Sequence, residues 1–328
     1  MTPIVSICCI TYNHEKYIKE TLKSLVNQKT TFEYEIIVHD DASTDNTRNI
    51  IEEFRKKYPD LIKTIYQDTN QYSQKIRILY EHVIPNVNTN YLAFCEGDDY
   101  WVDKNKLQIQ FDFLEQNLEY SSCFHGVVKV NISGESNGGF LGPVNRGDKD
   151  YTLSDVAMGG VLHLSSLFLR NSVIKDEIPQ WATKTANSDY TLAVISSATG
   201  KIRFFDRIMS AYRVGVEGSA MTKDREEYSK SNIIRKFKER NEILEEANRY
   251  YKFKHNIEFT KIINNYELRI NILEKKYKFL LDRKIFSYTK NYKISYILKV
   301  GMVTLFPNII ESILRKYHSL KIAFNKKL

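Results

Sequence analysis

The chain has 328 residues and a mass of 38.5 kDa, with 42% hydrophobic and 27% charged residues. These values are ordinary for a globular protein, and the few glycines (13) and prolines (6) exclude collagen-like or largely disordered chains. At roughly 150 residues per domain, the length predicts two domains, or one large α/β domain with an extension.

The net charge of +8 is unevenly distributed along the chain. Residues 225–328 hold 24 Lys and Arg against 11 Asp and Glu, whereas residues 1–224 hold 24 against 29. A basic segment of this kind binds phosphate, either in nucleic acid or at a lipid surface.

The four cysteines form no CxxC pair, which is typical of reduced thiols in a cytosolic protein. The N-terminal residues lack the basic segment and long apolar core of a signal peptide. No apolar run reaches the roughly 18 residues that a membrane-spanning helix requires, so we expect no such helix.

Apolar periodicity predicts strands and helices in alternation through the first 130 residues. We expect strands at residues 5–10, 35–39, 61–66, 91–95 and 123–130, and helices at 15–27, 46–58, 75–83 and 106–117. This order predicts an α/β fold with a Rossmann-like, mostly parallel sheet and helices on both faces.

Later segments carry weaker patterns. Residues 133–150 are rich in Gly, Asn and Asp and predict a mobile loop. Residues 162–169 and 202–205 predict strands, and residues 189–197 predict a helix. From residue 226 onward the pattern is helical and charged, which predicts a C-terminal helical extension.

Polar and acidic clusters follow three of the predicted strands: residues 11–13, 40–41 and 96–99. In parallel sheets, ligands bind beyond the carboxyl ends of the strands. Helix capping could explain Asn13 or Asp45, but it does not explain two pairs of adjacent carboxylates. The sequence therefore predicts a binding site at this edge of the sheet.

The third cluster has the composition of a metal site. Glu96, Asp98 and Asp99 place three carboxylates within four residues, which is costly unless a cation is bound. Oxygen ligands favour Mn²⁺ or Mg²⁺ and leave positions for substrate phosphates. Gly97 leaves room for the close approach of a diphosphate.

The phosphate-binding loops GxxxxGK[ST] and GxGxxG are absent from the sequence. A diphosphate would therefore be neutralised by metal and by a cation. Asp40 and Asp41 can accept hydrogen bonds from a base or ribose, and Tyr12 can stack on a base for about 1–3 kcal/mol. The candidate cations are Lys75, Arg77 and Arg213.

Three segments together, residues 5–13, 36–47 and 91–101, resemble the family 2 glycosyltransferases with the GT-A fold. The resemblance covers about residues 3–215, with the motifs in the same order and spacing. It implies an inverting transferase that moves a sugar from a nucleotide diphosphate, usually UDP, to an acceptor hydroxyl. It also implies a catalytic domain at residues 1–224, with a nucleotide-binding half (1–103) and an acceptor half (104–224).

The resemblance assigns the donor side of the site to the strand-end clusters. Tyr12, between Thr11 and Asn13, stacks on the base, and Asp41, beside Asp40, hydrogen-bonds it. Residues 96–98 take the place of the family's DXD motif, with Asp98 as the main metal ligand. Asp99 contacts the ribose or donor sugar, or supports the metal. Because the first acid is Glu rather than Asp, Glu96 is expected at the ribose or at a metal-bound water.

The resemblance also assigns the acceptor side. The segment around Asp189 resembles the family's helix start that carries the general base, and a helix N-terminal cap is the alternative role. Should Asp189 be only a cap, Asp176 and Glu177 are the next candidates. Arg213 lies in the closing strand, where Gly215 replaces a histidine of many members, so Arg213 is expected to contact phosphate.

The remaining residues of interest have structural interpretations. His39 and Trp101 are expected to pack, with sugar stacking as the alternative for Trp101. His125 and His163 are expected in the core, with acceptor contact as the alternative.

Residues 225–328 form the predicted basic helical region. Within it, residues 283–328 carry ten Lys and Arg and one Glu among aromatic and aliphatic residues. This composition is typical of a helix on an anionic membrane surface. A helical subdomain packed on the catalytic domain is the alternative. Nucleic-acid binding has no motif to support it.

Two functions follow from these patterns. The first is a metal-dependent glycosyltransferase at the cytoplasmic face of the plasma membrane. It would extend a lipid-linked saccharide for a surface polysaccharide such as a capsule. The second is a catalytically inactive sugar-nucleotide or glycan-binding scaffold. A nucleotidyltransferase is disfavoured because residues 11–15 contain no Gly-rich basic loop.

Overall fold

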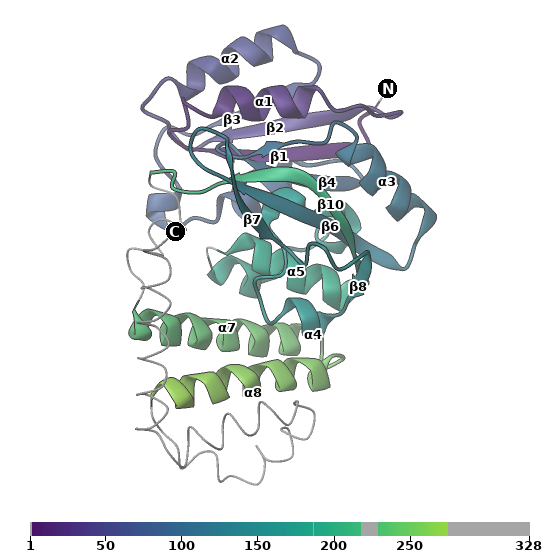
Figure 1. Ribbon diagram of the computed structural model, residues 1–328, viewed down its shortest axis with the longest axis vertical. Coiled ribbons are helices and arrows are strands. Elements are labelled where there is room, and N and C mark those ends of the chain that lie inside the picture. The colour runs from purple at the N-terminus through teal and green to yellow at the C-terminus, as the bar shows by residue number, and fades with distance from the viewer. Residues whose placement is uncertain (1, 186, 218–228, 275–328) are drawn as a thin grey trace.

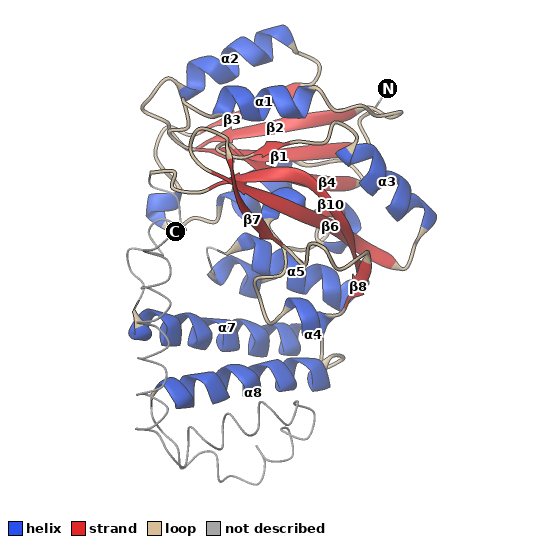
Figure 2. Cartoon of the chain, viewed as in Figure 1, coloured by secondary structure: helices blue, strands red, loops and turns tan. Residues whose placement is uncertain are grey.

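A computed structural model describes residues 2–185, 187–217 and 229–274 of the chain (Figure 1). A ten-stranded sheet runs through it in the order β3-β2-β1-β4-β9-β6-β10-β5, with β7 beside β6 and β8 beside β10. Helices lie on both faces of this sheet (Figure 2). The predicted α/β architecture with a C-terminal helical extension is confirmed.

The first half of the sheet is parallel, as the alternation of elements predicted. Its strands are β1 (Val5–Thr11), β2 (Tyr34–Asp40), β3 (Ile62–Tyr66) and β4 (Tyr91–Glu96). Helices α1 (Ile18–Val26), α2 (Thr47–Lys57) and α3 (Lys106–Gln116) pack on one face.

The second half of the sheet is mixed. β9 (Phe168–Arg170) lies between β4 and β6 (Tyr120–Val130) and is antiparallel to both, whereas β6 and β10 (Lys201–Arg213) are parallel. The short β5 (Tyr100–Trp101) pairs with the far end of β10. This pairing returns the chain after β4 to the same sheet.

Apolar cores form on both faces of the sheet because alternate side chains of a strand point to opposite faces. In β1, Ile7 and Cys9 pack toward α1, α2 and α3, whereas Cys8 packs toward α5 (Ser188–Thr199), α7 (Lys230–Tyr250) and α8 (Asn256–Leu273). Figure 1 shows α7 and α8 side by side, on the side of the sheet away from α1 and α2. All four cysteines are buried and free, as expected.

Three sequence-based predictions differ from the structure. Residues 133–150 are not a loop, because β7 (Ser136–Leu141) pairs with β6 and β8 (Lys149–Tyr151) pairs with β10. Of the strand expected at 162–169, only Phe168 and Leu169 are in a strand, β9, and Leu164–Ser166 before it form a 3₁₀ turn, η4. Only Leu79–Val83 of the helix expected at 75–83 is helical, as a π-helical turn, η2.

Several short elements complete the fold. They are η1 (Tyr72–Gln74), η3 (Ile84–Asn86), α4 (Leu153–Val156), η5 (Asn171–Val173) and η6 (Gln180–Lys184). Among the described residues, no helix combines the length and the apolar character needed to cross a membrane. The basic segment 283–328 lies outside the described residues.

Candidate active site

The predicted clusters meet at one edge of the sheet because β1, β2 and β4 are parallel and in register. Thr11 pairs with Asp40 across β1 and β2, and Ile10 pairs with Glu96 across β1 and β4. The loops that follow these strands therefore share one surface, as the rule for ligand sites in α/β sheets predicts.

A carboxylate–histidine group lies at the end of β4. Ligand atoms of Glu96, Asp99 and His163 all lie within 4.8 Å of one another. Asp99 is buried; its Oδ1 accepts a hydrogen bond from the backbone N–H of Arg213 at 3.0 Å. Its Oδ2 has no hydrogen-bond partner and lies 3.8 Å from Nε2 of His163. A buried carboxylate oxygen of this kind is suited to a cation.

Burial and mutual repulsion disfavour negative charge in this group. Burial raises the pKa of Glu96, and the nearby Asp98 and Asp189 carboxylates add to the effect. Burial also raises the pKa of Asp99 well above its usual range, with Asp98 and Glu96 contributing, while Arg213 opposes. A divalent cation would reverse these shifts, because it stabilises the ionised carboxylates.

His163 completes the group as a neutral imidazole. Burial lowers the pKa of His163 to about 4, so its ring is neutral at physiological pH. Its Nδ1 accepts from the backbone N–H of Ser165 at 3.3 Å and lies 2.9 Å from the Ser165 hydroxyl. The hydrogen bond from the Ser165 N–H places the ring proton on Nε2. A metal bond at Nε2 would require the other tautomer, in which Nδ1–H donates to the Ser165 hydroxyl oxygen in place of accepting from the N–H.

Asp98, the predicted main metal ligand, lies beside this group rather than in it. Its Oδ2 is 3.8 Å from Nε2 of His14, and only 7% of the residue is exposed. His14 in turn lies with Nδ1 3.2 Å from the Thr11 hydroxyl. The structure thus gives two carboxylate–histidine pairs, Asp99 with His163 and Asp98 with His14, at adjacent positions.

The approach of β1 to the acidic loop explains Gly97. A Cβ at this position would lie 2.3 Å from Oγ1 and 2.6 Å from Cβ of Thr11. The space that we expected to admit a diphosphate is therefore filled by Thr11 and His14. Gly97 allows the two strand ends to come together.

Among the remaining donor-side residues, Tyr12 has an exposed ring, whereas the polar side chains accept hydrogen bonds that hold loops. Tyr12 is 41% exposed at the surface of the site, as base stacking requires. Asn13 accepts from the backbone N–H of Thr44 at 2.8 Å, and Asp40 accepts from the Ser43 hydroxyl at 2.5 Å.

Asp41 holds the next loop in the same way. Its carboxylate accepts from the backbone N–H groups of Gln71 and Tyr72, at 2.7 and 3.0 Å. A nucleotide bound by Asp40 or Asp41 would therefore contact a carboxylate that already accepts hydrogen bonds from its own loop.

Arg213 is enclosed rather than directed into an open site. Its guanidinium pairs with Glu20 of α1 and donates to the Asp98 carbonyl at 2.5 Å. The same group lies 4.9 Å from the ring centroid of Tyr17 and 4.8 Å from that of Tyr100. Arg213 therefore holds the acidic loop through the Asp98 carbonyl. For Arg213 to contact a phosphate, its ion pair with Glu20 would have to open.

The other predicted cations differ in their surroundings. Arg77 donates through Nε to the Thr183 carbonyl at 3.1 Å. Lys75 is exposed, in a left-handed conformation with φ of 65°.

Asp189 lies near the acidic group. It is the second residue of α5, and its charge contributes to the raised pKa of Glu96. Burial raises the pKa of Asp189 to about 6, while the backbone N–H of Tyr190 and the charge of Arg240 oppose this shift. The Tyr190 N–H donates to Oδ1 of Asn187, the N-cap residue, at 3.4 Å and to Oδ1 of Asp189 itself at 2.7 Å. A carboxylate with a pKa of about 6 is ionised at neutral pH and can accept a proton.

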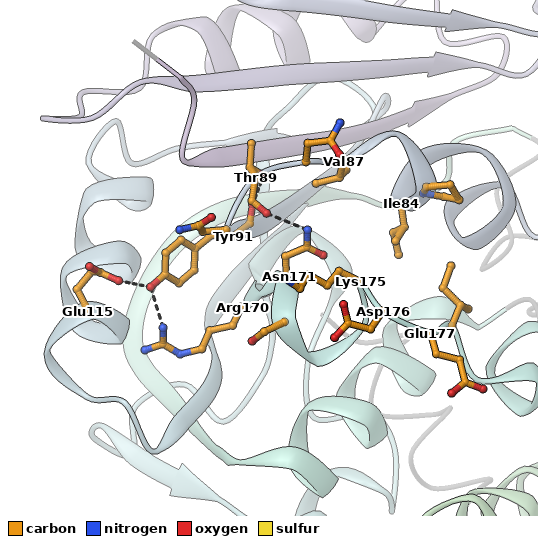
Figure 3. A pocket seen from close by; sticks show the side chains of 15 residues that line it. Ile84, Val87, Thr89, Tyr91, Glu115, Arg170, Asn171, Lys175, Asp176 and Glu177 are labelled. Carbon is orange, nitrogen blue, oxygen red and sulfur yellow. Dashed lines mark hydrogen bonds between the residues drawn. The ribbon is translucent and has the colours of Figure 1, made fainter.

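A cavity of about 790 Å³ lies at the other end of β4, away from the acidic group (Figure 3). It is lined by Tyr91, the first residue of β4, and by Arg170, Asn171 and Lys175. Asp176 and Glu177, the alternative bases, also line this cavity. They belong to the opposite edge of the sheet, which weakens their candidacy.

Sequence reasoning missed three contributors to the site: His163, His14 and Glu20. His163 is buried, as expected of a core residue, but it faces Asp99. No residue near His163 in the sequence marks this contact. Trp101 packs as expected, with the Lys106 ammonium 3.9 Å from its ring centroid.

Comparison with solved structures identifies the fold class. The chain superimposes on TarS of S. aureus in complex with UDP with a TM-score of 0.56 at 19% identity, covering 89% of this chain and 76% of that one. It also superimposes on the mannosyltransferase PcManGT from Pyrobaculum calidifontis, in complex with GDP-Man and Mn²⁺. There the TM-score is 0.52 at 13% identity, covering 94% and 88%. The fold is that of the GT-A glycosyltransferases.

Comparison with known sequences finds a family domain in the first part of the chain. Residues 6–139 match the model described as glycosyl transferase family 2. They therefore form a family 2 glycosyltransferase domain.

Relatives extend this likeness. An uncharacterized protein of Mycobacterium tuberculosis is 33% identical over 214 residues, 65% of this chain and 60% of that protein. The dTDP-rhamnosyl transferase RfbG of Shigella flexneri is 35% identical over 130 residues, 39% and 43% of the two chains. The glucosyltransferase WfgD of Escherichia coli, named for UDP-Glc and a GlcNAc-diphosphoundecaprenol acceptor, is 29% identical over 129 residues, 39% and 48%. The chain thus spans about three fifths of the mycobacterial relative.

Proposed function

We propose that this protein is a metal-dependent inverting glycosyltransferase that moves a sugar from a nucleotide diphosphate, with UDP the first candidate, to an acceptor hydroxyl. The observation that carries the proposal is the group formed by Glu96, Asp99 and His163, with Asp189 near it. This group lies at the carboxyl ends of parallel strands, within a family 2 glycosyltransferase domain.

The chemistry of the donor set fits Mn²⁺ or Mg²⁺. The unpartnered Oδ2 of buried Asp99, the half-buried Glu96 carboxylate and Nε2 of His163 would hold the ion, and Asp98 lies close enough in sequence to join them. Carboxylate donors suit both ions. A bound ion would supply positive charge that neutralises the diphosphate of the donor and of the product.

The protein's own residues account for the remaining steps. Tyr12 offers an exposed ring on which the base stacks. Asp189 accepts the proton of the acceptor hydroxyl as its oxygen bonds to the anomeric carbon. The bond from that carbon to the diphosphate oxygen breaks on the opposite face, so the configuration inverts. The proton then passes from Asp189 to solvent.

For the acceptor, we propose a lipid-linked saccharide in surface polysaccharide synthesis, reached at the inner face of the plasma membrane. The printed name of WfgD, with its diphosphoundecaprenol-linked acceptor, supports this class. The net positive charge of residues 225–328 supports contact with an anionic membrane.

Calorimetric titration with UDP, GDP and dTDP, each with Mn²⁺ and with EDTA, tests the donor half of the proposal. One nucleotide should bind in Mn²⁺ and lose affinity by about tenfold or more in EDTA, the scale on which metal-site changes act. Asp99→Asn should abolish this dependence on metal. Equal affinity with and without metal would exclude the metal role.

Thermal unfolding of the same variant provides the folding control. The raised pKa of Asp99 means that its ionised form is disfavoured in the folded protein at neutral pH. Removing that charge should therefore leave the metal-free protein at least as stable as the wild type, whereas Mn²⁺ should stabilise only the wild type.

Release of nucleotide diphosphate, measured with UDP-, GDP- and dTDP-sugars and lipid-linked saccharides, tests transfer itself. Metal-dependent nucleotide binding without transfer to any acceptor would instead favour the inactive scaffold.

A further inference from the structure

The helical pair α7–α8 contacts the acceptor side of the candidate site through Arg240. α7 packs against η6 and α8 against α4, on the far side of α5 from the sheet (Figure 1). The Arg240 guanidinium lies 5.0 Å from the ring centroid of Tyr190 and 5.8 Å from that of Tyr266. Its Nη1 also donates to the Tyr266 hydroxyl at 3.2 Å. Tyr190 directly follows Asp189 in the chain.

The same aromatic pair holds the segment that leads to His163. The Tyr190 hydroxyl donates to the Ala157 carbonyl at 3.0 Å, and the Tyr266 hydroxyl donates to the Met158 carbonyl at 2.8 Å. Both rings are buried, so these hydrogen bonds are shielded from water. The segment is thereby fixed five residues before His163.

Arg240 also contacts this segment directly. Gly159 adopts a left-handed φ of +75°, and a Cβ there would lie 2.7 Å from Nη1 of Arg240. The guanidinium therefore occupies the space beside Gly159 while its Cζ lies over the two tyrosine rings. A planar group with several donors can make all of these contacts, which a lysine ammonium cannot.

We propose that Arg240 is a positioning residue of the acceptor half: through Tyr190 and Gly159 it fixes the start of α5, where Asp189 lies, and the loop that ends in His163. This inference rests on the proposed function, since it assigns Asp189 the acceptor proton. The charge of Arg240 also opposes the effect of burial on the pKa of Asp189, which is consistent with their proximity.

Two substitutions at Arg240 and one control on the same helix test the proposal. Arg240→Met keeps the aliphatic stem and removes the charge and the donors, whereas Arg240→Lys keeps the charge. Arg235→Met removes an exposed ion pair with Glu239 and serves as the matched control. Arg240→Met should lower kcat for transfer by about 10- to 100-fold, as misplacement of a catalytic group does. The KM for the nucleotide sugar should not change, Arg240→Lys should recover part of the rate, and Arg235→Met should behave as wild type.

A double-mutant cycle with Asp189→Asn separates positioning from general damage. If Arg240 acts through Asp189, then Arg240→Met should cause little further loss in the Asp189→Asn background. If the rate losses of the two single variants multiplied in the double variant, the proposal would be overturned. It would also be overturned if nucleotide affinity in Arg240→Met fell by the same factor as the rate.

Hydrogen exchange gives a readout that does not depend on transfer. Arg240→Met should speed amide exchange in peptides covering residues 157–163 and 187–192, and should leave residues 34–40 unchanged. Wild-type protein without transferase activity would refute the proposed function. Exchange that does not change in the variant would refute the positioning role of Arg240 in either case.

Discussion

Asp189 lies at the start of α5, and its Oδ1 accepts the N–H of Tyr190 at 2.7 Å. Asp189→Asn keeps the size of the side chain and removes the proton acceptor. We expect transfer to fall by roughly 10²- to 10⁴-fold, the usual range for a general base. Nucleotide and metal affinity should barely change, because the role proposed for Asp189 is on the acceptor. Steady-state rates and calorimetry measure the two effects.

Asp176→Asn is the matched control for this substitution. Asp176 is exposed and lines the cavity at the opposite edge of the sheet. Its removal should leave transfer unchanged. If Asp176→Asn abolished transfer while Asp189→Asn did not, the base would lie at that edge and the assignment of Asp189 would be wrong.

The pKa of Asp189 predicts a pH dependence of transfer. Burial raises this pKa to about 6. A base must be ionised to accept a proton, so the rate at saturating donor should rise about tenfold per pH unit below roughly pH 6 and level off above it. Rates at fixed saturating Mn²⁺ measure this limb. Nucleotide affinity measured over the same pH range separates the ionisation of Asp189 from that of Glu96 and Asp99.

The motif residues of the site could be predicted from the sequence, but their partners could not. Glu96, Asp98 and Asp99 are adjacent in sequence, so their shared role is visible as a pattern. His163 reaches Asp99 only because β9 is inserted beside β4, and nothing near His163 in sequence marks that contact. Arg240 lies still further along the chain, in α7, whose sequence pattern indicates only that one face of the helix is packed.

At the scale of elements, the contact between the ends of β1 and β4 depends on Gly97. A Cβ there would overlap Thr11, whose side chain is buried against the strand end. Gly97→Ala should therefore push the acidic loop outward and cost about 1–3 kcal/mol in the free energy of unfolding. It should also weaken metal-dependent nucleotide binding. Urea denaturation and calorimetry measure both effects.

Gly138→Ala offers a comparison for that prediction. Gly138 has a φ of +74°, and a Cβ there would meet no atom within 4 Å. It should cost only backbone strain and leave nucleotide binding intact. Equal behaviour of the two alanine variants would show that close approach of the strands is not what requires Gly97.

The elements of the first 130 residues could be predicted because their apolar patterns match their structure. Residues 133–150 could not, since their Gly- and Asn-rich sequence forms β7 and β8 only by pairing with β6 and β10. The π-helical turn Leu79–Val83, in place of the expected regular helix, could not be predicted from the apolar spacing either. Local propensity is overridden where neighbouring strands supply the hydrogen-bond partners.

At the scale of the whole molecule, the charge asymmetry predicts membrane contact through residues 283–328. Removing them should reduce binding to vesicles of anionic lipid and leave nucleotide binding intact, because the site is built from residues before 217. Vesicle co-sedimentation at low salt measures the first effect, with neutral-lipid vesicles as the control. A full-length protein that does not bind anionic vesicles at low salt would contradict the prediction.

The position of β9 has a consequence for how the chain is made. Phe168–Arg170 fills the gap between β4 and β6, and the Arg170 side chain donates to the Tyr91 hydroxyl and to the Tyr120 carbonyl, at 2.8 and 2.9 Å. During synthesis on the ribosome, β4 emerges long before the strand that covers it. Its backbone then presents an open edge on which another nascent chain could add a strand. The parallel part of the sheet, β1 to β4, therefore completes its folding only after Phe168–Arg170 has been translated.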